Sequence, residues 1–185
     1  MSDIHPPNFH LDMRRCSLLT YQLFTSQHLP MGQKEAFEFF EDPGNLCNIT
    51  PPWLTFCMLN KESSRGVYEN AEFDYTIKFL GIKMPWRSRI IDYQPPERFT
   101  DIQVKGPYKS WTHLHVLERV PGGTLIRDEV TYALHLPALM LHPFLIRKKL
   151  IDIFTYRAVK IAEWAENTEP KKRKDIHRFH RQRHR

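Results

Sequence analysis

The amino-acid sequence predicts an α+β fold in which a curved antiparallel sheet of about seven strands wraps a long C-terminal helix. Three observations lead to this fold class. Apolar and polar residues alternate between residues 73 and 134, and glycine and proline turn signals interrupt them, as in consecutive strands. Residues 144–166 instead repeat apolar side chains at three- and four-residue steps, which is typical of a helix. Two short helical segments separate the first strand from the others.

The N-terminal part contains that first strand and the two short helices. Residues 1–17 are polar, include two prolines and are expected to form an arm. The domain is expected to cover residues 18–167 and to begin with the strand LLTYQLFTSQHL, which is rich in Leu, Thr and Tyr. The next segment has an apolar helical face and is interrupted at Pro43. A second helical turn, at 45–49, ends before Pro51.

The remaining strands follow from strict alternation, of which FDYTIKF at 73–79 is the clearest case. The other strand segments are IKMPWRSRIIDY, RFTDIQVKG, SWTHLHVLERV and TLIRDEVTYAL. The proline and the two glycines of PGG at 121–123 join the last two strands as a hairpin turn. The predicted helix at 144–166 is roughly 34 Å long at 1.5 Å per residue, so it can cover the apolar face of the sheet.

The basic charge of the chain is concentrated at its C-terminus. The formal net charge is +6, but eight of the 27 basic and one of the 21 acidic residues lie in 170–185, which leaves 19 basic and 20 acidic residues before them. We expect residues 168–185 to form a disordered basic tail, and weak contact of residues 170–185 with nucleic acid or an anionic surface is the alternative role. No stretch approaches the roughly 18 apolar residues of a membrane-spanning helix, so we expect no transmembrane segment and a cytoplasmic protein.

Polar side chains gather on the inward faces of three strands that are expected to be neighbours. Alternation places seven of them there: Asp101 and Gln103, then Trp111, His113 and His115, then Asp128 and Tyr132. Each buried polar group without a partner would cost about 1–3 kcal/mol, so these groups must bond to one another, to water or to a ligand.

Three interpretations of this group compete. In the first, which is favoured, Asp–His and Asp–Tyr pairs satisfy one another and fix the strand register. In the second, His113 or His115 acts as a general acid or base while Asp101 or Asp128 orients it, as cyclisation or dehydration of a poly-ketone would require. The third is a metal site. It ranks last, and no metal is expected, because His-x-His stands without a further clustered His or Cys.

Four segments together resemble the SRPBCC superfamily, also called START-like or helix-grip proteins: DPGNLCNITPPWL, GIKMPWRSRI, PPERFTDIQVKGPYKSWTHLH and GGTLIRDEVTYALHLP. The nearest branch is the one labelled polyketide cyclase/dehydrase or SRPBCC ligand-binding protein, and the resemblance covers roughly residues 18–165. It implies a helix-grip fold, a hydrophobic cavity between the sheet and the long helix, and no obligatory cofactor. Related domains are sometimes fused to nucleotide-sugar-epimerase-like oxidoreductases.

The expected function is therefore the binding of a small hydrophobic ligand, such as a lipid, isoprenoid, polyketide or aromatic metabolite. The expected ligand-binding residues are Tyr75, Trp86, Gln103, Tyr108, Trp111, Tyr132 and Phe154. The alternative is a cyclase or dehydratase, for which His113, His115, Asp101 and Asp128 are the catalytic candidates. An interaction protein that works through the basic tail ranks third. Tyr156 and Arg157 lie on the long helix, at positions whose facing the pattern leaves open by about one residue.

Overall fold

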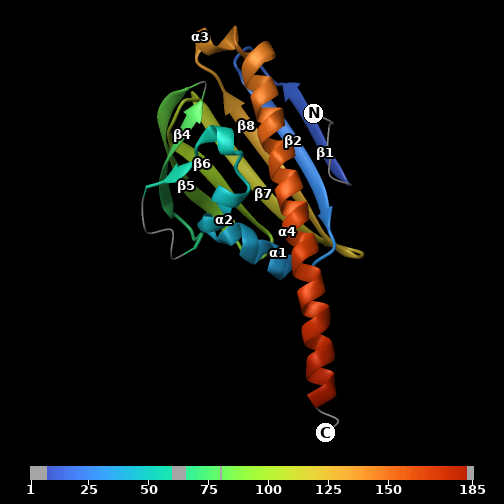
Figure 1. The fold of residues 1–185 in the computed structure, drawn as a ribbon. Helices are drawn as coiled ribbons and strands as arrows, with labels where there is room; N and C mark the ends of the chain where they lie inside the picture. The colour runs from blue at the N-terminus through green and yellow to red at the C-terminus, as the bar shows by residue number, and fades with distance from the viewer. Residues whose placement is uncertain (1–7, 60–65, 80, 183–185) are drawn as a thin grey trace.

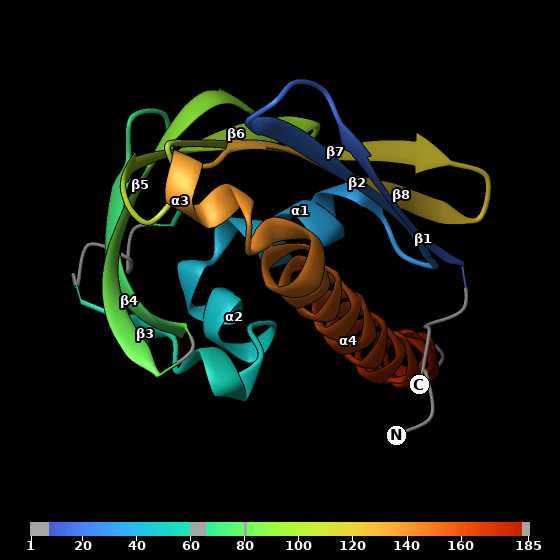
Figure 2. The same cartoon turned by 90° about the horizontal axis from the view of Figure 1, so that it is seen from above.

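The computed structural model describes residues 8–59, 66–79 and 81–182, with the backbone alone described for residue 79 and for 169–182. The described residues form an eight-stranded antiparallel sheet in the order β1-β2-β8-β7-β6-β5-β4-β3, which curves around the helices (Figures 1 and 2). Its strands are β1 (Phe9–Arg15), β2 (Thr20–Leu29), β3 (Cys57–Met58), β4 (Glu72–Phe79), β5 (Ile82–Gln94), β6 (Arg98–Lys105), β7 (Ser110–Val120) and β8 (Gly123–Ala133). The predicted α+β helix-grip architecture is confirmed.

The helices lie on the concave side of the sheet (Figure 2). They are α1 (Gln33–Glu41), α2 (Pro43–Asn48), the 3-10 helix η1 (Pro52–Leu54), α3 (Leu136–Leu139), the π-helix η3 (His142–Ile146) and α4 (Arg147–Gln182). Asp42 separates α1 from α2 because its side chain accepts a hydrogen bond of 2.8 Å from the backbone N–H of Gly44, while Pro43 occupies the first turn of α2. The predicted break between the two short helices is thus confirmed.

Strand alternation divides each strand into a covered and an open face. On β2 every second residue from Tyr21 to Leu29 is buried, and β8 follows the same rule from Thr124 to Tyr132. The buried side chains form two apolar clusters. One includes Phe37, Phe99 and Ile161, and the other includes Leu23, Trp111 and Phe154.

Both ends of the chain differ from the sequence prediction. Residues 9–15, expected to belong to an arm, form β1, which pairs with β2 along its whole length. Its half-buried Phe9, Leu11 and Met13 alternate with exposed polar residues, as expected for a strand that packs with one face. At the other end, the helical backbone of α4 continues through Gln182 instead of ending before a disordered tail (Figure 1). Lys, Arg and Gln are good helix formers, and an existing helix propagates readily.

Candidate functional site

The strand register brings four predicted catalytic candidates together in the middle of the sheet. Asp101 on β6 pairs with His113 on β7, and His115 pairs with Asp128 on β8. His113, His115 and Asp128 are buried, while the Asp101 side chain is 18% exposed. Arg157 reaches the same place from α4 and is also buried. We call these five residues the inner charged cluster.

Asp128 is the residue to which the rest of the cluster connects. Its Oδ1 lies 2.9 Å from Nε2 of His113 and 3.0 Å from Nδ1 of His115. Its Oδ2 accepts a hydrogen bond of 3.0 Å from the hydroxyl of Thr25 on β2. Arg157 Nη2 lies 3.5 Å from Oδ1 and completes an ion pair with the carboxylate. One carboxylate therefore contacts both histidines, a hydroxyl and a guanidinium.

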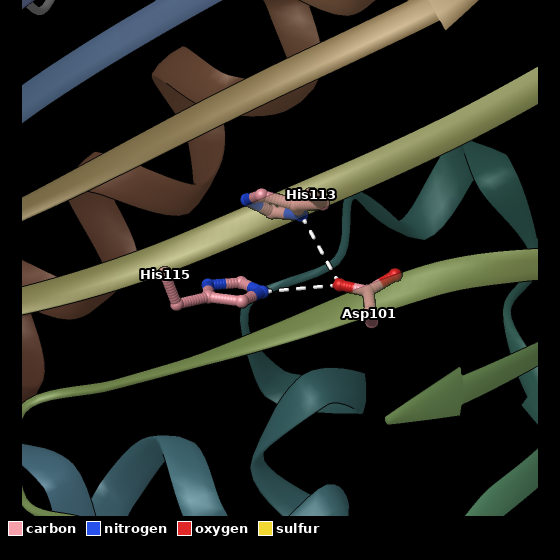
Figure 3. A group of neighbouring side chains, drawn as sticks. All are labelled: Asp101, His113 and His115. Carbon is pink, nitrogen blue, oxygen red and sulfur yellow. Dashed lines mark hydrogen bonds and ion pairs between the residues drawn. The ribbon is translucent and has the colours of Figure 1, made fainter. Parts of the chain in front are cut away.

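Asp101 contacts the same two imidazoles from the other side. Its Oδ2 lies 3.1 Å from Nε2 of His115 and 3.4 Å from Nδ1 of His113, so both interactions converge on one oxygen (Figure 3). The two rings lie against each other with centroids 3.8 Å apart. Each histidine is consequently held between two carboxylates, with neither ring free to turn without losing a partner.

Burial and pairing act on the pKa values in opposite directions. Burial raises the pKa of Asp128, but Arg157 and the two histidines outweigh it and hold that pKa well below its usual range. The pKa of Asp101 is lowered in the same way, with burial opposed by the histidines. Burial lowers the pKa of His113, with His115 acting in the same direction. For His115 the bonds to Asp101 and Asp128 outweigh burial, and the pKa is raised. Two carboxylates thus face one permanent cation, Arg157, and one histidine that favours its charged form.

Arg157 is positioned by contacts between α4 and the rest of the domain. Gln27 on β2 donates a hydrogen bond of 2.9 Å to the backbone carbonyl of Ala158. This bond joins α4 to the sheet next to Arg157. The Arg157 guanidinium lies 5.3 Å from the ring centre of Phe40 on α1. Its Nη2 is also 3.3 Å from Nδ1 of His115, whereas its buried Nε has no hydrogen-bond partner among the described residues.

Two adjacent cavities lie between the sheet and the helices. The larger, of about 350 Å³, is mainly apolar and is lined by Tyr75, Trp86, Tyr108, Trp111 and Phe154, among others. The smaller, of about 160 Å³, is lined by Asp101, His113, His115 and Arg157 together with apolar residues of α1 and α2. His113, Arg157, Tyr75, Trp86 and Trp111 line both cavities. The apolar cavity therefore meets the inner charged cluster through shared walls.

Some predicted site residues lie elsewhere. Gln103 does not face either cavity, because its amide bonds twice to the backbone of Tyr108 and closes the turn between β6 and β7. Tyr132 is fully buried behind the wall, where its hydroxyl bonds to Nε2 of His142 at 2.8 Å. Asp128 also does not line either cavity and contacts the histidines from behind.

Sequence reasoning did not assign two members of the site: it left the facing of Arg157 open by about one residue, and it did not consider Thr25. Arg157 lies three residues after Phe154 on the apolar stripe of α4, and this helical spacing is the signal that places it inward. Thr25 lies two residues after Leu23 on β2, so alternation alone assigns it to the covered face. His142 of η3, to which the sequence assigned no role in the site, is buried, and its ring centre lies 3.6 Å from that of Tyr21.

Comparisons with known proteins support the fold. No protein-family model and no curated protein matches the sequence. Protein Ms6760 from Mycobacterium smegmatis is similar, with a TM-score of 0.62 and 17% identity, over 86% of this chain and 99% of that one. The di-domain ARO/CYC protein StfQ from the steffimycin biosynthetic pathway has a TM-score of 0.65 and 14% identity, over 83% of this chain and 53% of StfQ.

A nucleoside-diphosphate sugar epimerase from Corynebacterium glutamicum is similar over a smaller part of its length. The TM-score is 0.54 and the identity 24%, over 76% of this chain and 28% of the epimerase. At these identities a shared structure establishes the fold alone. Within residues 8–59, 66–79 and 81–182, no helix is long and apolar enough to cross a membrane.

Proposed function

We propose that this protein is an SRPBCC-type binding protein for a small, largely apolar ligand that carries one polar, electron-rich group. The observation that carries this proposal is the apolar cavity of about 350 Å³ beside the inner charged cluster. That volume lies within the roughly 300–1,000 Å³ of small-molecule sites, which combine apolar walls with a few convergent polar groups. Lipids, isoprenoids, polyketides and aromatic metabolites with a carbonyl, hydroxyl or carboxylate group have this chemistry.

Arg157 is the residue best suited to receive the polar group. It lines both cavities and carries a permanent positive charge, and its buried Nε–H has no hydrogen-bond partner among the described residues. A buried donor without an acceptor costs about 1–3 kcal/mol, and a ligand oxygen would remove that cost. The aromatic rings of Tyr75, Trp86 and Trp111 supply the adjoining apolar walls.

The wall of the larger cavity reaches the surface near α3 and η3. Leu141 lines that cavity and is also 53% exposed, and Met140 and Phe144 beside it are 82% exposed each. An apolar rim next to an apolar cavity favours the entry of an apolar molecule.

The proposal is tested with anilinonaphthalene sulfonate, a fluorescent probe that has an aromatic body and one anionic group. Met84 lines the larger cavity, and Met84→Trp should weaken probe binding by about tenfold or more because the added ring occupies the space. The matched control is Leu18→Trp, which adds the same ring at a residue that is 63% exposed and lines neither cavity. Equal binding by the two variants would place the probe outside the cavity and contradict the proposal.

A second candidate function is a cyclase or dehydratase with His113 as its general base. One observation favours it: His113 lines both cavities while its Nε2 is held by Asp128, an arrangement that orients an imidazole toward a bound molecule. His113→Gln should then abolish conversion of a linear poly-ketone probe while its affinity changes by only a few-fold. Absence of conversion by the unmodified protein, or full conversion by the variant, would remove this candidate.

A further inference from the structure

Three side chains of the inner charged cluster present metal-binding atoms to one point on the cavity wall. Asp101, His113 and His115 each offer one such atom, and these atoms lie within 4.8 Å of one another. Oδ2 of Asp101 is 3.1 Å from Nε2 of His115 and 3.4 Å from Nδ1 of His113 (Figure 3). Ligands held at about 2.0–2.1 Å around a tetrahedral ion stand roughly 3.3 Å apart, so the two distances from Asp101 are close to those of a coordination shell.

We propose that Asp101, His113 and His115 form a binding site for a divalent first-row transition metal, with zinc and iron(II) as the best-suited ions. Two imidazoles and one carboxylate are a donor set that suits these ions when the remaining coordination positions stay open. The three side chains line the smaller cavity, which leaves the open positions on the side of a bound molecule. An oxygen atom of that molecule can then coordinate the ion.

The residues behind the imidazoles support the same assignment independently of the spacing. A histidine that binds a metal almost always donates its other ring N–H to a carboxylate or carbonyl, which fixes the ring. Here the two remote nitrogens, Nε2 of His113 and Nδ1 of His115, face the same oxygen of Asp128 at 2.9 and 3.0 Å. Asp128 is therefore a positioning residue for both rings, and the Thr25 hydroxyl holds its other oxygen.

The fixed charges of the cluster accommodate a divalent ion together with one anionic ligand group. A histidine that coordinates a metal does so as the neutral imidazole, so a bound ion displaces the proton that His115 favours, and the carboxylates of Asp101 and Asp128 then carry two negative charges against the single positive charge of Arg157. A divalent ion reverses the sign of this residual charge, and one anionic ligand group then brings the cluster to neutrality. A bound metal would also occupy Nδ1 of His113, the atom that would act as the base in the proposed cyclase or dehydratase. Metal binding and this catalytic role of His113 therefore exclude each other.

The test is a metal titration of the full chain after dialysis against a chelator, without any organic ligand. We expect one tight equivalent of Zn²⁺, and of Co²⁺ with the visible absorption of a four-coordinate site. Asp101→Asn and His115→Gln should weaken binding by about a hundredfold or more, and Asp128→Asn by about 10–100-fold. His10→Gln, which changes an exposed histidine of β1, should bind as the unmodified protein does. Every variant keeps His177, His180 and His184, so any weak metal binding by these histidines is the same in each titration and does not affect the comparison.

A second measurement keeps the proposal testable if the variants fold poorly. X-ray absorption of the Zn²⁺-loaded unmodified protein should contain two imidazoles and oxygen ligands at about 2.0–2.1 Å. The assignment would be overturned if the unmodified protein bound no Zn²⁺, or if Asp101→Asn and His115→Gln bound it as tightly as the unmodified protein. It would also be overturned if the X-ray absorption showed no imidazole ligands. The proposed metal site does not depend on the proposed ligand-binding function. Binding of the fluorescent probe by the chelator-treated protein tests the ligand-binding function alone, so the failure of either proposal can be recognised separately.

Discussion

The two faces of the sheet each carry a group of charged side chains, and the groups differ in their contact with water. On the outer face, Arg87 on β5 donates two hydrogen bonds of 2.7 and 2.8 Å to Asp74 on β4, and Arg89 pairs with Glu72. We call these four residues the outer charged group. Their side chains are 34% or 43% exposed, so they remain in contact with water in the folded chain. Ion pairs of this kind contribute about 0–1 kcal/mol.

The inner charged cluster contains similar chemical groups in a different environment. Its histidines and Asp128 are only 6–7% exposed and lie between two apolar clusters. Burying charges is unfavourable by several kcal/mol for each ion, and mutual attraction offsets this only when the geometry is complete. Apolar side chains would cover the sheet at least as well. The comparison therefore supports the proposal that the inner cluster binds a ligand or an ion, whereas the outer charged group lies at a solvated surface.

The largest expected effect comes from breaking the inner cluster at Asp128. Asp128→Asn removes the carboxylate charge that forms the ion pair with the buried Arg157 and that both histidines face. The free energy of unfolding in urea should fall by about 3–5 kcal/mol. Asp74→Asn, the same change in the outer charged group, should lower it by less than about 1 kcal/mol. Similar losses in the two variants would mean that burial does not separate the two groups.

Replacing the whole inner cluster tests whether stability or binding retains it. The replacement combines Asp101→Leu, His113→Phe, His115→Phe, Asp128→Leu and Arg157→Met. Urea unfolding should give a free energy that is unchanged or higher by about 1–4 kcal/mol, because the desolvation of the charges is removed together with their pairing. Binding of Zn²⁺ should disappear. A severe loss of stability would instead identify the cluster as a structural requirement of the fold.

His142 separates the effect of burial from the effect of carboxylate partners. Burial lowers its pKa, helped by Arg147 and Arg15, and its partners are the Tyr132 hydroxyl and the Tyr21 ring. Below the unfolded pKa of about 6.5 the unfolded chain takes up a proton that the folded protein resists, so this histidine makes stability fall as pH falls.

The variant His142→Gln should therefore lose more stability at pH 8 than at pH 5.5, measured by urea unfolding at both values. An equal difference at the two pH values would show that His142 does not contribute to the pH dependence. The contrast is with His115, which is also buried but has two carboxylate partners and a raised pKa.

The smallest effect is expected for the outer charged group. Arg87→Gln removes the paired hydrogen bonds to Asp74 and should lower the free energy of unfolding only slightly, because water solvates the guanidinium. Added salt should reduce the difference further, because the Debye length falls from about 10 Å at 0.1 M to about 3 Å at 1 M. A larger, salt-independent loss would assign this group a structural role.

Much of the fold and part of the site could be predicted because strand periodicity fixes which face a residue occupies. The alternation in TLIRDEVTYAL correctly assigns Asp128 and Val130 to the covered face, and that in SWTHLHVLERV does the same for His113 and His115. The sequence did not predict β1. As an edge strand it contributes only half-buried residues on one face, so it has few apolar residues from which alternation could be recognised.

Strand periodicity predicts which face of the sheet a side chain occupies, but it does not predict whether that side chain lines the cavity or lies behind its wall. This position decides the role of each residue within the site. Gln103 was predicted to face the ligand, but its amide satisfies the turn at Tyr108. Asp128 was grouped with Asp101, yet one carboxylate lies behind the imidazoles and the other lines the cavity. The His-x-His pair alone is weak evidence for a metal site, because the third donor, Asp101, comes from another strand, β6. The structure pairs β6 with β7 and places Oδ2 of Asp101 3.1 Å from Nε2 of His115 and 3.4 Å from Nδ1 of His113.

The most direct test of a retained binding site is native mass spectrometry of the full chain, purified without denaturation. If the covered side of the sheet holds a small apolar molecule, the mass should exceed that of the chain by one such molecule, which is released when the protein is unfolded. Met84→Trp should lose this molecule and Leu18→Trp should keep it. A chain that carries no molecule and binds none from a library of lipids, isoprenoids and polyketides would contradict the proposed function.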